Sequence, residues 1–220
     1  MSSVTQTVVQ GSPEWLKQRL GDFTSSEIKQ LLVSPQKGAK IAIGAMTYIL
    51  EKVAERYIQK PINQFTSRAT EHGSDTENLA FRTAIKRLGI DFRTCGYIKH
   101  PTVKRLGGSP DGYNGGEYVL EIKCPLNPVN HLKNLAIKTA EDFKKMHPDY
   151  YYQVMLNTFL CGAKYAVFVS FCPEFPKHTG KGFFSITMEL DMEAIREIEN
   201  RVLLAEEWIA ENFPDLPQIN

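Results

Sequence analysis

The sequence predicts an α/β protein in which helices flank a mixed central β-sheet. Stretches with helical spacing of apolar residues alternate along the chain with shorter stretches that have strand-like alternation. Apolar residues make up 42% of the 220 residues, which is enough for one sizeable core. No internal repeat or low-complexity linker divides the chain. We therefore expect a single domain over residues 1–220.

Helices are predicted from capping residues and apolar spacing. Ser12-Pro13-Glu14 is typical of a helix start, and Gly21 of a helix end. Thr24-Ser25-Ser26-Glu27 has the pattern of a capping box, which would place Ser26 in the first turn of a second helix. Later helices are predicted at residues 46–57, 77–88, about 149–160, and from 191 to the proline at 214.

Strands are predicted by alternation with a period of two. The turn Asn114-Gly115-Gly116 leads into residues 117–123, where apolar side chains alternate with polar ones or with a valine. Glu121 and Lys123 then project from the same face of one strand. Weaker alternation begins near residue 92, and two more strands are predicted at 164–171 and 183–190.

The hairpin around this strand carries the clearest chemistry. Asp111 precedes the turn, so a short hairpin would bring its carboxylate near that of Glu121. Two carboxylates and a backbone carbonyl suit a hard divalent cation such as Mg²⁺, which binds phosphate oxygens and stabilises charge during phosphodiester cleavage. A neighbouring Lys123 can orient the attacking water, and can help to deprotonate it if its own pKa falls.

A charged, solvent-exposed hairpin is the alternative interpretation. Glu-x-Lys is common on strands, and Pro110-Asp111-Gly112 is an ordinary turn sequence. The combination is more specific, because Ser-Pro-Asp is followed, after residues 112–120, by Glu-Ile-Lys on an otherwise apolar strand. Charges on such a strand are costly unless they are paired or bound to metal.

Composition constrains the function only loosely. The net charge is +1, which neither indicates nor excludes a nucleic-acid partner. The four cysteines are not spaced like zinc ligands, and no signal peptide or transmembrane run is apparent. We therefore expect a cytoplasmic protein with reduced thiols and no membrane partner.

The motif pattern resembles the P-D…E-x-K nuclease superfamily and, within it, the phage lambda exonuclease (YqaJ-like viral recombinase) family. Several segments resemble motifs of that family and occur in the family's order over roughly residues 12–172. These segments are WLKQRLGDFTSSEI at 15–28, HGSDTEN at 72–78, GGSPDG at 107–112, EIKCP at 121–125 and YYYQVMLNTFL at 150–160. Each segment alone is weak, but together they are specific.

The resemblance implies a restriction-endonuclease-like core and a Mg²⁺-dependent 5′→3′ exonuclease. Its substrate would be linear double-stranded DNA with a 5′-phosphate end, and its product a 3′ single-stranded overhang for recombination by single-strand annealing. It further implies two metal ions per active site, with Mn²⁺ as an alternative to Mg²⁺. A ring-shaped homotrimer, a single-strand annealing protein as partner, and a phage or prophage gene expressed in a bacterial cell are also implied.

Matching positions to the family's motifs implies roles for individual residues. Asp111, Glu121 and the carbonyl of Ile122 would bind metal. Glu77 would assist the second metal ion or its water. Lys123 would act on the attacking water.

Further roles follow from the same resemblance. Gln153 would orient the nucleophile or a metal-bound water, and Arg19, Ser26 and Ser109 would form a pocket for the 5′-phosphate. A helix N-terminus with hydroxyls and an arginine suits phosphate on physical grounds as well. The structural alternatives are a first-turn glutamate at Glu77, a satisfied buried amide at Gln153 and a surface arginine at Arg19.

Two other functions stay open at this stage. One is a structure-selective or restriction-type DNA endonuclease, which would use the same hairpin. The other is a non-catalytic DNA-binding protein of the same fold, against which the intact Asp111, Glu121 and Lys123 argue.

Overall fold

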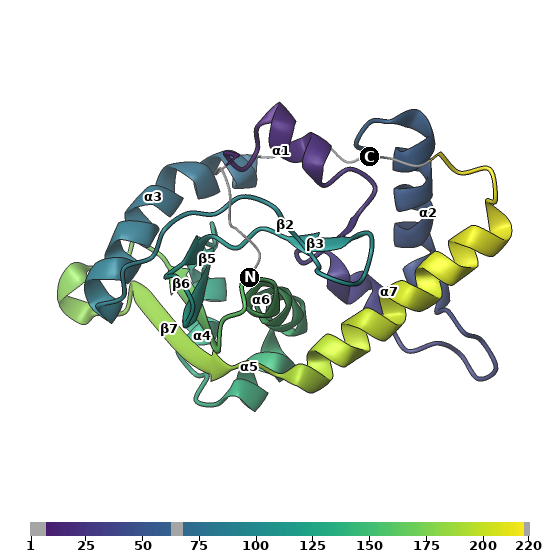
Figure 1. Ribbon diagram of the computed structural model, residues 1–220. Helices are drawn as coiled ribbons and strands as arrows, with labels where there is room; N and C mark the ends of the chain where they lie inside the picture. The colour runs from purple at the N-terminus through teal and green to yellow at the C-terminus, as the bar shows by residue number, and fades with distance from the viewer. Residues whose placement is uncertain (1–7, 63–67, 218–220) are drawn as a thin grey trace.

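The computed structural model describes residues 8–62 and 68–217, with backbone alone for 68–75 (Figure 1). The helices are α1 (Pro13–Gln18), η1 (Ile28–Leu32), α2 (Ile43–Ile58), α3 (Arg68–Leu88), α4 (Pro128–Asn134), α5 (Ala140–Met146), α6 (Pro148–Leu160), η2 (Lys177–Thr179) and α7 (Met192–Asn212), where η marks a 3₁₀ helix. The strands are β1 (Phe23–Thr24), β2 (Ile98–Lys99), β3 (Leu106–Gly108), β4 (Gly112–Tyr113), β5 (Tyr118–Lys123), β6 (Tyr165–Phe171) and β7 (Phe183–Glu189).

The described strands form two sheets. A small sheet has the order β1-β3-β2, and a four-stranded sheet has the order β4-β5-β6-β7. In the larger sheet β5 is parallel to β6, while the pairs β4–β5 and β6–β7 are antiparallel. The predicted mixed α/β fold with flanking helices is confirmed. Its division into two sheets was not apparent from the sequence, because strands as short as β1 and β2 show too few residues for alternation.

Helices cover both faces of the larger sheet. Leu120 and Ile122 of β5 pack with Val167 of β6 against Ala80 and Ala84 of α3. On the opposite face lies α6, which appears end-on near the centre of Figure 1. Period-two alternation therefore has the predicted effect on β5: one set of side chains meets α3, and the other set, which includes Glu121, meets α6.

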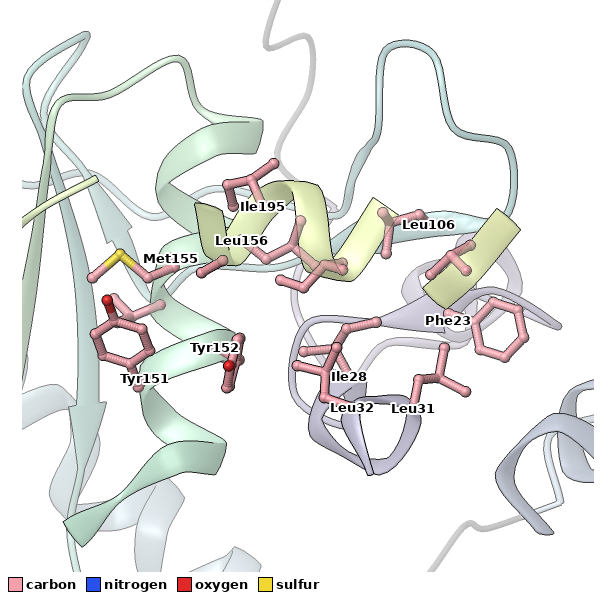
Figure 2. Close-up of a cluster of buried hydrophobic side chains, with 14 of the residues drawn as sticks. Phe23, Ile28, Leu31, Leu32, Leu106, Tyr151, Tyr152, Met155, Leu156 and Ile195 are labelled. Atoms are coloured by element: carbon pink, nitrogen blue, oxygen red, sulfur yellow. The ribbon is translucent and has the colours of Figure 1, made fainter. Parts of the chain in front are cut away.

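The larger core lies between α6, α7 and the segment from β1 to η1. Figure 2 shows Met155 and Leu156 of α6 and Ile195 of α7 on one side of this core. Phe23 and Ile28 approach it from the N-terminal segment and, like the other three, are fully buried. The core thus fixes the N-terminal segment against α6, the helix that also faces Glu121.

The predicted position of Ser26 in a helix is wrong. Glu27 is the residue before the 3₁₀ helix η1, so Ser26 lies in a turn outside that helix. Thr24, the expected cap, is instead extended in β1, and its hydroxyl bonds to Arg19. Thr24 pairs with Gly107 in the sheet, so it does not serve as the cap of a helix.

The start predicted for the helix at 77–88 is also wrong. Helix α3 begins at Arg68, so Glu77 lies inside it and is not a first-turn glutamate. Leu79, one of the apolar residues whose spacing predicts this helix, is 48% exposed. The side chains of residues 72–75, which belong to the motif at 72–78, lie outside the described residues.

The predicted helices at 46–57, 149–160 and 191–214 and the strands at 117–123, 164–171 and 183–190 are confirmed to within a few residues, whereas α1 ends at Gln18 and not at Gly21. Ser12 caps α1 by accepting a hydrogen bond from the N–H of Trp15, and Asp191 caps α7 by accepting from Glu193 and Ala194. The short helices α4 and α5 were not predicted. Within the part of the chain that the structure describes, no helix is both long and apolar enough to cross a membrane.

Candidate active site

The β4–β5 hairpin brings Asp111 beside Glu121, as predicted. Gly112 pairs with Leu120 in the antiparallel register, so Asp111, the residue just before β4, lies level with Glu121. The Asp111 Oδ2 atom accepts a hydrogen bond of 2.6 Å from the backbone N–H of Ile122. This bond anchors the aspartate carboxylate on the strand that carries Glu121 and Lys123.

Glu121 is fully buried, and its carboxylate has three donors. Lys123 Nζ and Gln153 Nε2 each donate to Oε1 at 2.7 Å, and Asn157 Nδ2 donates to Oε2 at 3.3 Å. A buried carboxylate is tolerated only when it is satisfied in this way. The predicted contact between Gln153 and the site is therefore present, and Asn157 is an additional member.

Asn157 was missed by the sequence analysis, although a signal existed. It lies four residues after Gln153 on α6, so both side chains occupy the same helix face. Its side chain is fully buried, and its Oδ1 atom has no hydrogen-bond partner. A second amide at this spacing on a buried helix indicates a polar target that both amides share.

Negative charge is concentrated at the hairpin. Burial, and then the charge of Glu121, raise the pKa of Asp111 well above its usual range. Burial also raises the pKa of Glu77, which Lys123 lowers and Glu121 raises further, so Glu77 lies within electrostatic reach of both. Burial alone would lower the pKa of Lys123, but the carboxylates of Glu121 and Asp111 outweigh it and raise the pKa above its ordinary value.

The donor set fits a hard divalent cation. Asp111 and Glu121 offer carboxylate oxygens that repel each other and lie around a single lysine, and the neighbouring Ile122 offers a backbone carbonyl. Within the side chains that the structure describes, no cluster of three or more His, Cys, Asp or Glu could hold a metal. Cations here would therefore complete their coordination with backbone, water or phosphate oxygens, as Mg²⁺ commonly does.

The three residues predicted for phosphate binding lie in one cluster. The Arg19 guanidinium stacks 4.2 Å from the centre of the Trp15 ring and donates to Thr24 Oγ1 at 3.1 Å. Thr24 Oγ1 lies 3.4 Å from Ser26 Oγ, and Trp15 Nε1 donates to Ser109 Oγ at 2.9 Å. We call these five residues the Arg19 cluster. Trp15 and Thr24 join the three predicted members and were not identified from the sequence.

Comparison with known protein families shows which family the chain belongs to. A family model described as the YqaJ-like viral recombinase domain matches residues 14–164. The chain belongs to the YqaJ-like viral recombinase domain family. The match begins within α1 and ends at the residue before β6, so it includes both the hairpin and the Arg19 cluster, and the resemblance inferred from motifs is confirmed.

Solved structures agree with this family. The YqaJ-like chain is similar to an alkaline exonuclease, LHK-Exo, from Laribacter hongkongensis, with 27% identity, a TM-score of 0.78, and coverage of 93% of this chain and 96% of that one. LHK-Exo in complex with dAMP matches at 26% identity with a TM-score of 0.76, covering 94% and 100% of the two chains. A phage-related exonuclease from Haemophilus somnus 129PT shares the fold at 15% identity, with a TM-score of 0.71 and coverage of 89% and 96%. No curated protein sequence is significantly similar to the chain.

The Arg19 cluster and the hairpin of this YqaJ-like domain are joined by close backbone packing. Thr24 pairs with Gly107 in the parallel β1–β3 ladder, which brings the segment after Arg19 beside the segment before Asp111. A Cβ atom at Gly108 would overlap the side chains of Asn157 and Ser25. A glycine at 108 therefore lets β3 pass directly against α6.

A buried network of charged side chains on α2 holds the turn that follows Arg19. The Glu55 carboxylate accepts from the Gly21 N–H at 3.2 Å and from Lys52 Nζ at 3.1 Å. Arg56 Nε donates to the Gly21 carbonyl at 2.9 Å, and its guanidinium pairs with Glu206. Both backbone groups of Gly21, which has a φ of 70°, are thus held by side chains of α2. The turn between Arg19 and Thr24 is fixed by these bonds.

Replacing Glu55 by alanine is expected to destabilise the YqaJ-like domain by about 3 kcal/mol, because the buried Lys52 keeps only its longer contact of 3.7 Å with Glu27 and the Gly21 N–H loses its acceptor. The free energy of unfolding from urea titration measures this change. Glu51→Ala, on the same helix, is the matched control and should cost under about 1 kcal/mol. Equal losses in the two variants would contradict the network's role.

Proposed function

We propose that this protein is a metal-dependent exonuclease that degrades the 5′-ended strand of linear double-stranded DNA and leaves a 3′ single-stranded overhang for recombination by single-strand annealing. The observation that carries the proposal is the pairing of two sites in one segment. Ser109 belongs to the Arg19 cluster, and Asp111, two residues later, belongs to the carboxylate hairpin. A terminal phosphate held by the first site would place the next phosphodiester near the second.

The relatives support this reading of the geometry. The similar structures are described as exonucleases, and one of them was determined with dAMP, a nucleoside monophosphate. Removal of the terminal nucleotide from a 5′-phosphorylated strand yields a product of this chemical type. A phosphate pocket with an arginine and hydroxyls suits both the substrate's end and such a product.

In the proposed mechanism, Asp111, Glu121 and the Ile122 carbonyl would hold Mg²⁺ or Mn²⁺, two ions per site, with Glu77 serving the second ion or its water. When bound, these ions supply stabilisation for the charge that develops on the phosphoryl oxygens. Lys123 orients the attacking water. The negative charges of Glu121 and Asp111 raise the pKa of Lys123. Bound cations would offset these charges and so lower that pKa, which would let the lysine take a proton from the water.

Gln153 has a positioning role in this mechanism. Its amide donates to the same Glu121 oxygen that Lys123 approaches, which fixes the carboxylate between helix and strand. Arg19, Ser26 and Ser109 hold the 5′-phosphate and so set which phosphodiester is cleaved. The charge-assisted contacts of an arginine with phosphate supply both affinity and orientation.

We also propose the assembly that the family resemblance implies. Three copies would form a ring around the DNA, in the cytoplasm of a bacterial cell that carries the phage or prophage gene, and a single-strand annealing protein would receive the exposed strand. Light scattering coupled to size exclusion measures the mass of the assembly, and a mass of one chain, 24.9 kDa, would contradict the ring.

Arg19→Ala is expected to reduce kcat/KM for a 5′-phosphorylated linear duplex by roughly 10- to 100-fold, because a charged donor to the terminal phosphate is lost. The same variant should digest a 5′-hydroxyl duplex no more slowly than the wild type does. An end-labelled digestion assay with both substrates measures the two rates. Lys17→Ala, on the exposed side of α1, is the matched control.

The same assay distinguishes the alternatives. Ready cleavage of closed circular DNA would favour an endonuclease of the same fold, as would an equal effect of Arg19→Ala on both linear substrates. A complete lack of nucleotide release by the wild type with Mg²⁺ and with Mn²⁺ would favour a non-catalytic DNA-binding protein and contradict the proposed function.

A further inference from the structure

A cleft of about 470 Å³ opens next to the site described above and shares Lys123 with it. Its walls come from the end of β5, from α4 and from the junction of α5 and α6. The residues that matter for its chemistry are Lys123, Asn130, Lys133, Asn134, His147 and Tyr150. The volume is in the range of pockets that bind small ligands.

Helix α6 places this cleft relative to the other two sites. Near its N-terminus Tyr150 lines the cleft, with Lys123 Nζ 5.1 Å from the ring centre. Gln153, further along, bonds to Glu121, and Asn157 packs against Gly108 beside the Arg19 cluster. The rise from residue 150 to residue 157 is about 10 Å along the helix. The cleft and the Arg19 cluster therefore lie on opposite sides of Glu121.

Lys133 gives the cleft an available positive charge. Its side chain is exposed, and its Nζ has only a long contact of 3.4 Å with Asn130 Oδ1. Burial, and then the charge of Lys133, lower the pKa of His147 against the opposing charge of Asp149, which favours the neutral imidazole. Asp149 lines the cleft with the opposite charge but is exposed in the first turn of α6.

The wall behind Lys133 carries polar side chains that are held by hydrogen bonds. His147 Nε2 donates to Asn134 Oδ1 at 2.6 Å, and Asn134 Nδ2 donates to the Asn130 carbonyl at 3.3 Å. The His147 ring stacks on Tyr150, with centroids 5.4 Å apart. Amide and aromatic edges next to an exposed ammonium suit a nucleotide, which presents a flat base and an anionic phosphate.

We propose that this cleft binds the nucleotide on the 3′ side of the scissile bond, with Lys133 contacting the phosphate that follows it. The inference rests on the proposed function and extends it. The scissile strand runs from the Arg19 cluster, which holds the terminal phosphate, across Asp111 and Glu121, and into the cleft. Contacts on both sides of the cleaved bond align it with the attacking water.

Lys133→Ala tests the phosphate contact. With a 5′-phosphorylated duplex in Ca²⁺, fluorescence anisotropy should show Kd raised about 5- to 10-fold, and the slope of log K against log salt should fall by about 0.7 to 0.9, as for one lost phosphate contact. In Mg²⁺ the variant should raise KM and leave kcat within about twofold. Lys138→Ala, an exposed lysine in the following loop, is the matched control. Identical values for the two variants would overturn the proposal.

Photo-crosslinking identifies the occupant. A 5-iododeoxyuridine at the second position from the 5′ end should crosslink to the peptide that contains 147–150 when the complex is irradiated in Ca²⁺. The same probe at the first position, or in the complementary strand, should not. A crosslink from the complementary strand, or none from the second position, would overturn the proposal. Because this readout needs no cleavage, it decides the occupant of the cleft even if the wild type releases no nucleotide and the proposed function fails.

Discussion

Lys123→Ala is expected to lower the rate of nucleotide release from linear duplex DNA by about 10²- to 10⁴-fold, the range for loss of a positioned acid or base. Lys123 contacts the Glu121 carboxylate, and the proposed mechanism assigns it the attacking water. DNA binding should persist, because the Arg19 cluster and Lys133 are unchanged. Single-turnover digestion with excess enzyme, together with anisotropy in Ca²⁺, separates the chemical step from binding.

The control for this variant is Lys164→Ala, an exposed lysine just before β6. It should retain full activity. Circular dichroism should show that Lys123→Ala keeps its helices, since the carboxylate of Glu121 still accepts from Gln153 and Asn157. Digestion by Lys123→Ala at a rate within tenfold of the wild type would remove the lysine from the proposed mechanism.

Asp111→Asn is expected to abolish digestion and yet stabilise the metal-free protein by about 0.5 to 2 kcal/mol at pH 8. Burial and Glu121 raise the pKa of Asp111, so folding favours its protonated form. The metal-free wild type therefore loses stability as the pH rises from about 4, the ordinary carboxyl value, through the raised pKa. Asparagine keeps the acceptor for the Ile122 N–H but carries no charge.

Thermal unfolding with and without Mg²⁺ measures both parts of this prediction. Mg²⁺ should raise the Tm of the wild type and leave that of Asp111→Asn nearly unchanged, because a ligand that binds only the folded state stabilises it. At about pH 4 the metal-free wild type and the variant should converge. A variant that is less stable than the metal-free wild type at pH 8 would show that the carboxylate is held by favourable contacts and not under repulsion.

The β4–β5 hairpin was predictable because the information that specifies it is local. Alternation fixes which side chains of β5 share a face, and a glycine-rich turn fixes the partner strand, so Asp111, Glu121 and Lys123 could be placed from short stretches of sequence. Helix α6 was predictable for a similar reason. Its apolar length and its Gln153 are visible without knowledge of what surrounds them.

The support around the site depends on long-range pairing and could not be predicted from local patterns. The parallel contact of β1 with β3 joins residues about eighty positions apart, and it lies between the segment that carries Trp15 and Ser26 and the segment that carries Ser109. The hydrogen bonds of Glu55 and Arg56 to the backbone of Gly21 likewise depend on the packing of α2 against the N-terminal segment. Motif resemblance located Arg19, Ser26 and Ser109, whereas spacing alone gave no reason to group them.

The parallel pairing of β5 with β6 links folding accuracy to activity. The register runs from Tyr118 opposite Tyr165 to Lys123 opposite Ser170, across a long crossover that contains α4, α5 and α6. A slip of one residue would turn Glu121 away from α6 and into the apolar layer against α3. Such a molecule would keep most of its helical content but lose the proposed catalytic site. After refolding, the recovered specific activity would therefore measure the fraction of chains in which β5 and β6 have paired in the right register. Helical content alone would not measure that fraction.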